Sequence, residues 1–162
     1  MILFLDTEYT NPEDRGLISL AMVSEDGKRE FYLEVTDFPL GKCNSFVVSN
    51  VLPHLGKHPA HLASYEEINK PIAEWLNTLP RSIIIACDSF LDKEILLQAL
   101  GDIPLKNLNG WLDLRPMIDT GAYHAAVNKF HTEQRPWHHA LYDAQAHRAG
   151  WMAWMNEKNQ RA

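Results

Sequence analysis

The sequence contains few cysteines, no surplus of positive charge and no long hydrophobic run, and each shortage excludes a class of protein. Two cysteines in 162 residues are too few for a disulfide scaffold or a cysteine-based zinc site. Lysine and arginine number 15 against 21 acidic residues, and the net charge of −6 excludes a protein that binds nucleic acid or membranes through a large basic surface. Every apolar run is much shorter than the roughly 20 residues of a membrane-spanning helix. We therefore expect a protein of the reducing cytoplasm that has no membrane segment.

Length and hydrophobic patterning predict one α/β domain over residues 1–162. Short apolar runs come first, two of them joined by an Asp-Gly turn, and strand and helix patterns then alternate. This order predicts a mixed five-stranded sheet flanked by helices. The predicted strands cover residues 2–6, 17–23, 29–35, 82–87 and 110–114. The predicted helices cover residues 45–52, 65–77, 91–100, 117–128 and 139–158, and the rest of 36–63 is expected to be irregular.

Asp6 and Glu8 stand two residues apart at the end of the first predicted strand. Side chains two apart on a strand project from the same face, so the two carboxylates would lie together. Their mutual repulsion raises the pKa of each carboxyl, and a hard divalent cation such as Mg²⁺ or Mn²⁺ relieves that repulsion. Two solvated acids at a strand end would give the same short pattern, so the pair needs support from elsewhere in the chain.

Two further acidic segments follow a strand or open a helix, where sites in α/β proteins usually form. Asp88 and Asp92 come after the buried strand at 82–87, and Asp143 lies about one turn into the last predicted helix, with His138 just before it. Simpler roles also fit, because Asp88 or Ser89 would cap a helix and the helix dipole favours an acid in the first turn.

Taken together, four carboxylates and one histidine suit the hydrolysis of a phosphodiester with two metal ions. Such ions activate a water molecule and stabilise the leaving oxygen of an in-line displacement. A histidine with an ordinary pKa near 6.5 can accept the proton of that water at neutral pH.

Residues 4–10 (FLDTEYT), the segment around Asp92 and residues 138–145 (HHALYDAQ) together resemble the DEDDh class of 3′→5′ exonucleases, which includes ribonuclease T, oligoribonuclease and the proofreading subunit of bacterial replicative DNA polymerase. The segments LISLAMVSEDG, REFY and NVLPHL look like the small mycobacterial-type exoribonuclease family within that class. The resemblance covers residues 3–145. It implies a ribonuclease H-like fold, two divalent cations (Mg²⁺ or Mn²⁺) and a homodimer. The residues that match the motifs of the class are Asp6, Glu8, Asp92, His138 and Asp143.

The middle motif departs from the class. An asparagine often stands where this chain has Asp88, and an aromatic residue often stands where it has Leu91. The resemblance favours Asp92 as the metal ligand, with Asp88 as the second choice. The adjacent His139 competes for the role of general base, but the five-residue step to Asp143 selects His138.

The expected substrate is the 3′ end of single-stranded RNA, with DNA left open. Aromatic rings stack on bases, and Tyr9, Phe90 and Trp137 flank the three motifs. The resemblance implies that Thr7 and Tyr9 contact the terminal nucleotide. The candidate phosphate-binding residues are Lys93, Arg115 and Arg135.

The sequence is also compatible with two other functions. The same fold could serve as a non-catalytic nucleic-acid-binding module, and the same site could act on dinucleotides as a small-molecule phosphodiesterase. No run of basic residues indicates a long duplex footprint, so a short single strand is the better expectation.

Overall fold

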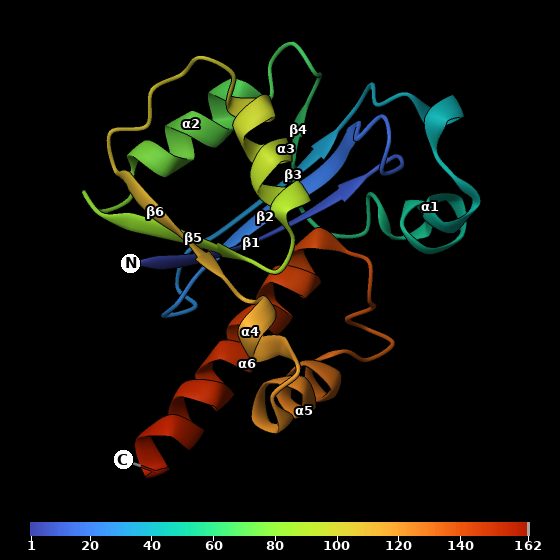
Figure 1. The fold of residues 1–162 in the computed structure, drawn as a ribbon. Helices are drawn as coiled ribbons and strands as arrows, with labels where there is room; N and C mark the ends of the chain where they lie inside the picture. Colours follow the sequence, from blue (N-terminus) through green and yellow to red (C-terminus); the bar gives the residue numbers. More distant parts are fainter. Residues whose placement is uncertain (162) are drawn as a thin grey trace.

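The first strand, β1 (Ile2–Tyr9), lies between β2 (Leu17–Ser24) and β5 (Ile83–Cys87) near the middle of a six-stranded sheet (Figure 1). It is antiparallel to β2 and parallel to β5. The computed structural model describes residues 1–161. The other strands are β3 (Glu30–Val35), β4 (His61–Ala63) and β6 (Leu108–Asp113), and the order across the sheet is β4-β3-β2-β1-β5-β6.

Helices cover both faces of the sheet (Figure 1). On one face lie α2 (Asn69–Asn77) and α3 (Phe90–Leu100), and on the other lie α4 (Arg115–Ile118), α5 (Gly121–Phe130) and the long α6 (Ala140–Arg161). A short helix, α1 (Ser45–Asn50), and two 3₁₀ turns, η1 (Leu40–Lys42) and η2 (Leu52–His54), lie beyond the strand ends.

Strand β1 contributes side chains to both faces of the sheet, because successive side chains of a strand point in opposite directions. Leu3 and Leu5 belong to the larger hydrophobic core beneath α2 and α3, whereas Phe4 belongs to the core beneath α5 and α6. Thr7 continues the first set, and Asp6 and Glu8 continue the second. The last residues of this strand therefore present polar groups to α3 on one side and to α6 on the other.

Local chemistry explains several of the boundaries. The Asp-Gly turn joins β2 to β3 as predicted, and Gly27 has a φ of +69°, which glycine adopts without strain. The Ser89 side chain accepts a hydrogen bond of 3.1 Å from the Leu91 N–H and caps α3. Gly101, with a φ of +58°, ends the same helix.

The α/β class with a mixed sheet flanked by helices is confirmed, but the predicted number of five strands is wrong. The sixth strand, β4, lies in a segment that we expected to be irregular, and it pairs in parallel with the edge strand β3. A strand of three residues is too short to show an alternating pattern, and the prolines and glycines around it favour an irregular segment.

Two predicted helices also differ from the structure. The helix expected over 117–128 is two helices, α4 and α5, separated by a break at Asp119 and Thr120. Helix α2 begins at Asn69 rather than at residue 65. The Ser64–Glu67 contact closes a turn before the helix, and Pro71 lies in the first helical turn, where proline is tolerated. No helix among the described residues is long and apolar enough to cross a membrane.

Helices α5 and α6 approach each other closely because residue 150 is glycine. A Cβ atom at Gly150 would lie 2.7 Å from two ring carbons of Tyr123, whose side chain is fully buried. We expect Gly150→Ala to lower the free energy of unfolding by about 1–3 kcal/mol, the usual cost of overpacking a core. Urea denaturation measures it. Gly41→Ala, where nothing lies within 4 Å of the added Cβ, is the matched control. Equal stability of the two variants would contradict the packing argument.

Candidate functional site

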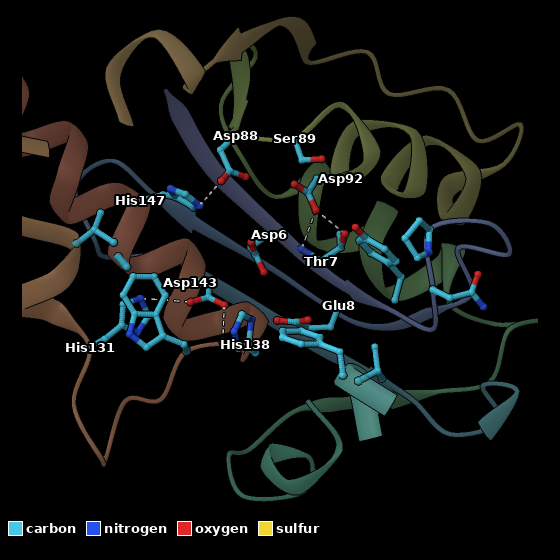
Figure 2. A pocket seen from close by; sticks show the side chains of 18 of the residues that line it. Asp6, Thr7, Glu8, Asp88, Ser89, Asp92, His131, His138, Asp143 and His147 are labelled. Carbon is cyan, nitrogen blue, oxygen red and sulfur yellow. Dashed lines mark hydrogen bonds and ion pairs between the residues drawn. The ribbon is translucent and has the colours of Figure 1, made fainter. Parts of the chain in front are cut away.

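Acidic side chains from three distant parts of the chain meet in one cavity of about 410 Å³ at the end of β1 (Figure 2). Asp6 and Glu8 come from β1, Asp88 follows β5, Asp92 lies in the first turn of α3, and Asp143 lies in the first turn of α6. The convergence follows from the topology, since β1 and β5 are parallel neighbours and end at the same edge of the sheet.

No lysine or arginine is among the described residues that line this cavity. Burial and, after it, the neighbouring carboxylates Asp143 and Asp92 raise the pKa of Asp6 and of Glu8 well above their ordinary values. Burial also raises the pKa of Asp92 and of Asp143, each to about 7. The protein thus concentrates negative charge where its own side chains supply no cation to balance it.

Asp92 is held by the backbone and side chain of Thr7. The Thr7 hydroxyl donates to Asp92 Oδ1 at 2.6 Å and the Thr7 N–H donates to the same oxygen at 3.2 Å. These hydrogen bonds favour the charged carboxylate and oppose the effect of burial on its pKa. One oxygen of Asp92 is therefore committed within the protein, and the carboxylate is fixed on the α3 side of β1.

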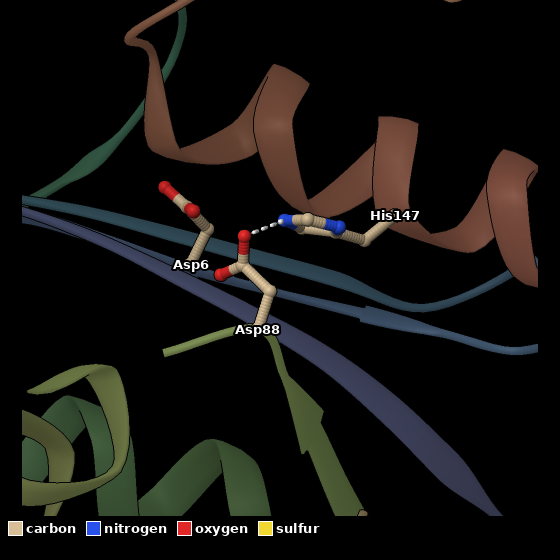
Figure 3. A group of neighbouring side chains, drawn as sticks. All are labelled: Asp6, Asp88 and His147. Atoms are coloured by element: carbon tan, nitrogen blue, oxygen red, sulfur yellow. Dashed lines mark ion pairs between the residues drawn. The ribbon is translucent and has the colours of Figure 1, made fainter. Parts of the chain in front are cut away.

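Asp88 lies on the other side, with Asp6 and His147 (Figure 3). These three residues each offer a ligand atom, and the three atoms lie within 4.8 Å of one another. His147 Nε2 is 3.6 Å from Asp88 Oδ2, and Nδ1 of the same ring is 2.8 Å from the Tyr123 hydroxyl. The structure thus groups Asp88, our second choice for the middle motif, with Asp6 and His147. The choice of Asp92 as a metal ligand stays a prediction.

A second group of three ligand atoms within 4.8 Å comes from Glu8, His138 and Asp143. The His138 backbone has a φ of +62°, a conformation that costs free energy for a residue with a side chain. This backbone directs the His138 N–H to Asp143 Oδ2 at 2.9 Å. Burial lowers the pKa of His138, so the imidazole is neutral at pH 7 and able to accept a proton.

The other oxygen of Asp143 faces His131. His131 Nε2 lies 3.3 Å from Asp143 Oδ1, and both atoms are buried without a hydrogen-bond partner. The Trp137 ring stacks on the His131 ring with centroids 3.7 Å apart, and the Arg135 carbonyl lies 3.2 Å from His131 Nδ1. The loop before α6 thereby sets the position of Asp143 as well as that of His138.

His139, the competitor for the general base, does not line the cavity. It is 3% exposed and packs among Tyr32, Tyr142 and His58. Burial lowers the pKa of its imidazole to about 4. Its neighbour His138, the residue chosen from spacing, does line the cavity.

The proposed substrate-binding residues divide into two sets. Thr7, Tyr9 and Trp137 line the cavity, and Trp137 is 46% exposed. Phe90 is exposed but is not among the lining residues, and its ring is covered by the Arg115 guanidinium at 3.9 Å.

The candidate phosphate-binding residues do not line the cavity either. The Arg115 guanidinium donates two hydrogen bonds to Asp113, while Lys93 lies over the Trp111 ring and Arg135 over the Phe130 ring.

Several residues that line the cavity were not predicted from the sequence, among them His147, His131 and Phe46. His147 lies four residues after Asp143 on α6, and this spacing places both on one face of a helix, so a search for Asp-x-x-x-His would have found it. His131 comes from a loop and Phe46 from α1, and neither carries a local pattern. The Phe46 ring contacts His138 edge-on, with centroids 4.8 Å apart, and is half-exposed in the cavity wall.

The donor set suits divalent cations. Carboxylate oxygens are ligands of Mg²⁺ and Mn²⁺, and a neutral imidazole adds a nitrogen ligand. The unpartnered Oδ1 of Asp143 is the kind of buried acceptor that a cation would satisfy. Comparison with protein-family models found no matching family, and comparison with curated proteins found no match.

A pH-dependent stability follows from the raised pKa of Asp143. This pKa is about 7 in the folded protein, whereas the ordinary value of an aspartate is 3.8. The contribution of protonated Asp143 to the free energy of unfolding is therefore present at low pH and is lost as pH rises through 7. In EDTA, Asp143→Asn should therefore raise the free energy of unfolding at pH 8 by about 1 kcal/mol or more, with the gain shrinking toward pH 5. Urea denaturation across this range measures the difference.

The exposed substitution Asp102→Asn is the control for this experiment and should show no such trend. Saturating Mn²⁺ should stabilise the wild type at pH 8 more than Asp143→Asn, because the cation replaces the missing positive charge. An Asp143→Asn protein that is no more stable than the wild type at pH 8 would contradict the electrostatic account.

Proposed function

We propose that this protein is a metal-dependent 3′→5′ exonuclease that removes 5′-mononucleotides from the 3′ end of single-stranded RNA. The observation that carries the proposal is the convergence of five carboxylates from β1, the β5–α3 turn, the first turn of α3 and α6 in one cavity with no lysine or arginine among its described lining residues. A phosphodiester is itself an anion, so such a cavity binds it only together with cations.

Each side chain then has a role. Asp6, Glu8 and Asp143 would hold two divalent cations with Asp88 or Asp92, and the ions would supply a Lewis acid for the attacked phosphate and its leaving oxygen. His138 accepts the proton of the attacking water, because its imidazole is neutral at pH 7 and lies beside Glu8 and Asp143. Thr7 holds Asp92, and His131 holds the ring of Trp137.

The size and walls of the cavity favour the end of a single strand. About 410 Å³ is within the usual range for small-ligand sites, so the cavity suits the last nucleotides of a chain rather than a duplex. The half-exposed rings of Phe46 and Trp137 flank His138, where a base can stack on them. The net charge of −6 with two divalent cations leaves about −2, which gives no long-range attraction to a long nucleic acid.

The test is a time course on 5′-labelled single-stranded RNA and matched DNA with Mg²⁺, with Mn²⁺ and with EDTA. We expect products that shorten from the 3′ end, release of 5′-monophosphates and no cleavage in EDTA. His138→Ala should reduce kcat about 10²–10⁴-fold, the usual contribution of a general base. Asp6→Asn should abolish activity, because it removes the carboxylate whose charge interacts with all four of the other acids in the cavity.

His124→Ala and Asp102→Asn change exposed residues away from the cavity and serve as matched controls. Cleavage that survives Asp6→Asn would place the chemistry elsewhere. Oligonucleotide binding without cleavage under either metal would identify a binding module instead of an enzyme.

The small cavity also supports a second function, the hydrolysis of dinucleotides as a phosphodiesterase. Comparison of kcat/KM for a dinucleotide and for a seven-residue RNA separates the two. An exonuclease should prefer the longer chain because additional nucleotides can contact the half-exposed rings of Phe46 and Trp137 in the cavity wall. Equal or better hydrolysis of the dinucleotide would instead assign the protein to short substrates.

The sequence resemblance also implies a homodimer, and the cysteine content implies a reducing cytoplasm. Both remain predictions. Cys43 and Cys87 are both free thiols in the structure, and the preference for RNA over DNA depends on a contact to the 2′-hydroxyl that the RNA-to-DNA rate ratio would reveal.

A further inference from the structure

Among the side chains that converge at the end of β1, one imidazole has no role in the chemistry proposed above. His147 comes from α6 and reaches the cavity on the side of Asp6 and Asp88 (Figure 3). Its side chain is 12% exposed, so only a small part of the ring meets solvent. A nitrogen ligand at this position changes which cation the site would prefer.

The hydrogen bonding of His147 resembles that of a metal-binding histidine. One ring nitrogen, Nδ1, lies 2.8 Å from the Tyr123 hydroxyl, and the other, Nε2, points toward Asp88 and Asp6. Histidines that ligate metals are usually oriented by a hydrogen bond at the nitrogen that does not bind the ion. The Tyr123 ring is fully buried and packed against Gly150, so this support is rigid.

The distance between His147 and Asp88 leaves room for an ion. Nε2 and Asp88 Oδ2 are 3.6 Å apart, which is too long for a good hydrogen bond, and the ligand atoms of Asp6, Asp88 and His147 lie within 4.8 Å of one another. Two ligands that bind one ion at about 2.0–2.2 Å each are separated by distances of this order. The same three residues therefore form a compact set of two oxygens and one nitrogen.

We infer that Asp6, Asp88 and His147 form a site for a first-row transition ion, Mn²⁺ in our test, in preference to Mg²⁺. This inference rests on the proposed function, because it names the cation at one of the two positions required there. Mg²⁺ prefers oxygen ligands and retains its waters, whereas transition ions gain from an imidazole nitrogen. Glu8 and Asp143 would hold the other position, beside the general base His138.

The direct test is electron spin-echo envelope modulation of Mn²⁺ bound at one equivalent to the full chain, which detects a directly coordinated imidazole nitrogen through its ¹⁴N coupling. We expect ¹⁴N coupling in the wild type and in His138→Gln, and its loss in His147→Gln. His124→Gln, an exposed histidine on α5, is the matched control and should keep the coupling. Absence of the coupling in the wild type, or its persistence in His147→Gln, would overturn the inference.

Calorimetric titration with Mn²⁺ and with Mg²⁺ gives a second readout. His147→Gln should weaken Mn²⁺ binding by about tenfold or more, with a smaller change for Mg²⁺, and Tyr123→Phe should act in the same direction because it removes only the hydroxyl that orients the ring. If His147 merely donated a hydrogen bond to Asp88, both metals would weaken equally, and that result would refute the preference. Should His147→Gln fail to fold, the spectra of the wild type and of His138→Gln still decide.

The outcomes separate this inference from the proposed function. RNA hydrolysis together with unchanged ¹⁴N coupling in His147→Gln would leave the exonuclease standing and remove the transition-metal site. Loss of the coupling in His147→Gln, from a protein that cleaves neither RNA nor DNA, would establish the metal site and remove the exonuclease.

Discussion

The repulsion among buried carboxylates at the end of β1 is the constraint on which the rest of this structure depends. Five acids share one cavity, and the pKa values of Asp6, Glu8, Asp92 and Asp143 rise because burial and neighbouring charges both oppose ionisation. Neutral hydrogen-bond donors, not cationic side chains, contact these carboxylates: the Thr7 hydroxyl donates to Asp92 and the His138 N–H donates to Asp143. Such hydrogen bonds fix the positions of the acids but leave their net charge in place. The hydrophobic cores on the two faces of the sheet must therefore hold together an arrangement that electrostatics alone would disperse.

The alternation of side chains along β1 explains how one strand organises a site that involves helices on both sides of the sheet. Thr7 projects toward α3 and fixes Asp92, while Asp6 and Glu8 project toward α6 and meet Asp143 and its neighbours. A shift of one residue in the pairing of β1 with β2 would exchange the two sets. The register of the sheet is thus as important to the site as the identity of the acids.

Much of this arrangement could be predicted from the sequence, and the parts that could not share a physical reason. β1, the β2–β3 hairpin and β5 combine strong apolar patterns with clear turn signals, and α6 follows from its long apolar face. β4 was missed because its three residues owe their strand conformation to pairing with β3. Asp6, Glu8, His138 and Asp143 belong to short motifs, and all four line the cavity. His131 lines it as well, but its place depends on a loop held by Trp137 and Arg135, which only the folded chain brings together.

The order of the elements along the chain has a consequence for biosynthesis. β1 carries Asp6 and Glu8 within the first ten residues, yet Asp143 and His147 reside on the last helix, and the His138 backbone is set by the loop immediately before it. A nascent chain on the ribosome therefore has the first acids of the cavity long before it has any of the histidines that line it. Any chemistry that needs both halves is withheld until α6 docks on the sheet, so the proposed attack on RNA would begin only after α6 has been synthesised and the chain has folded.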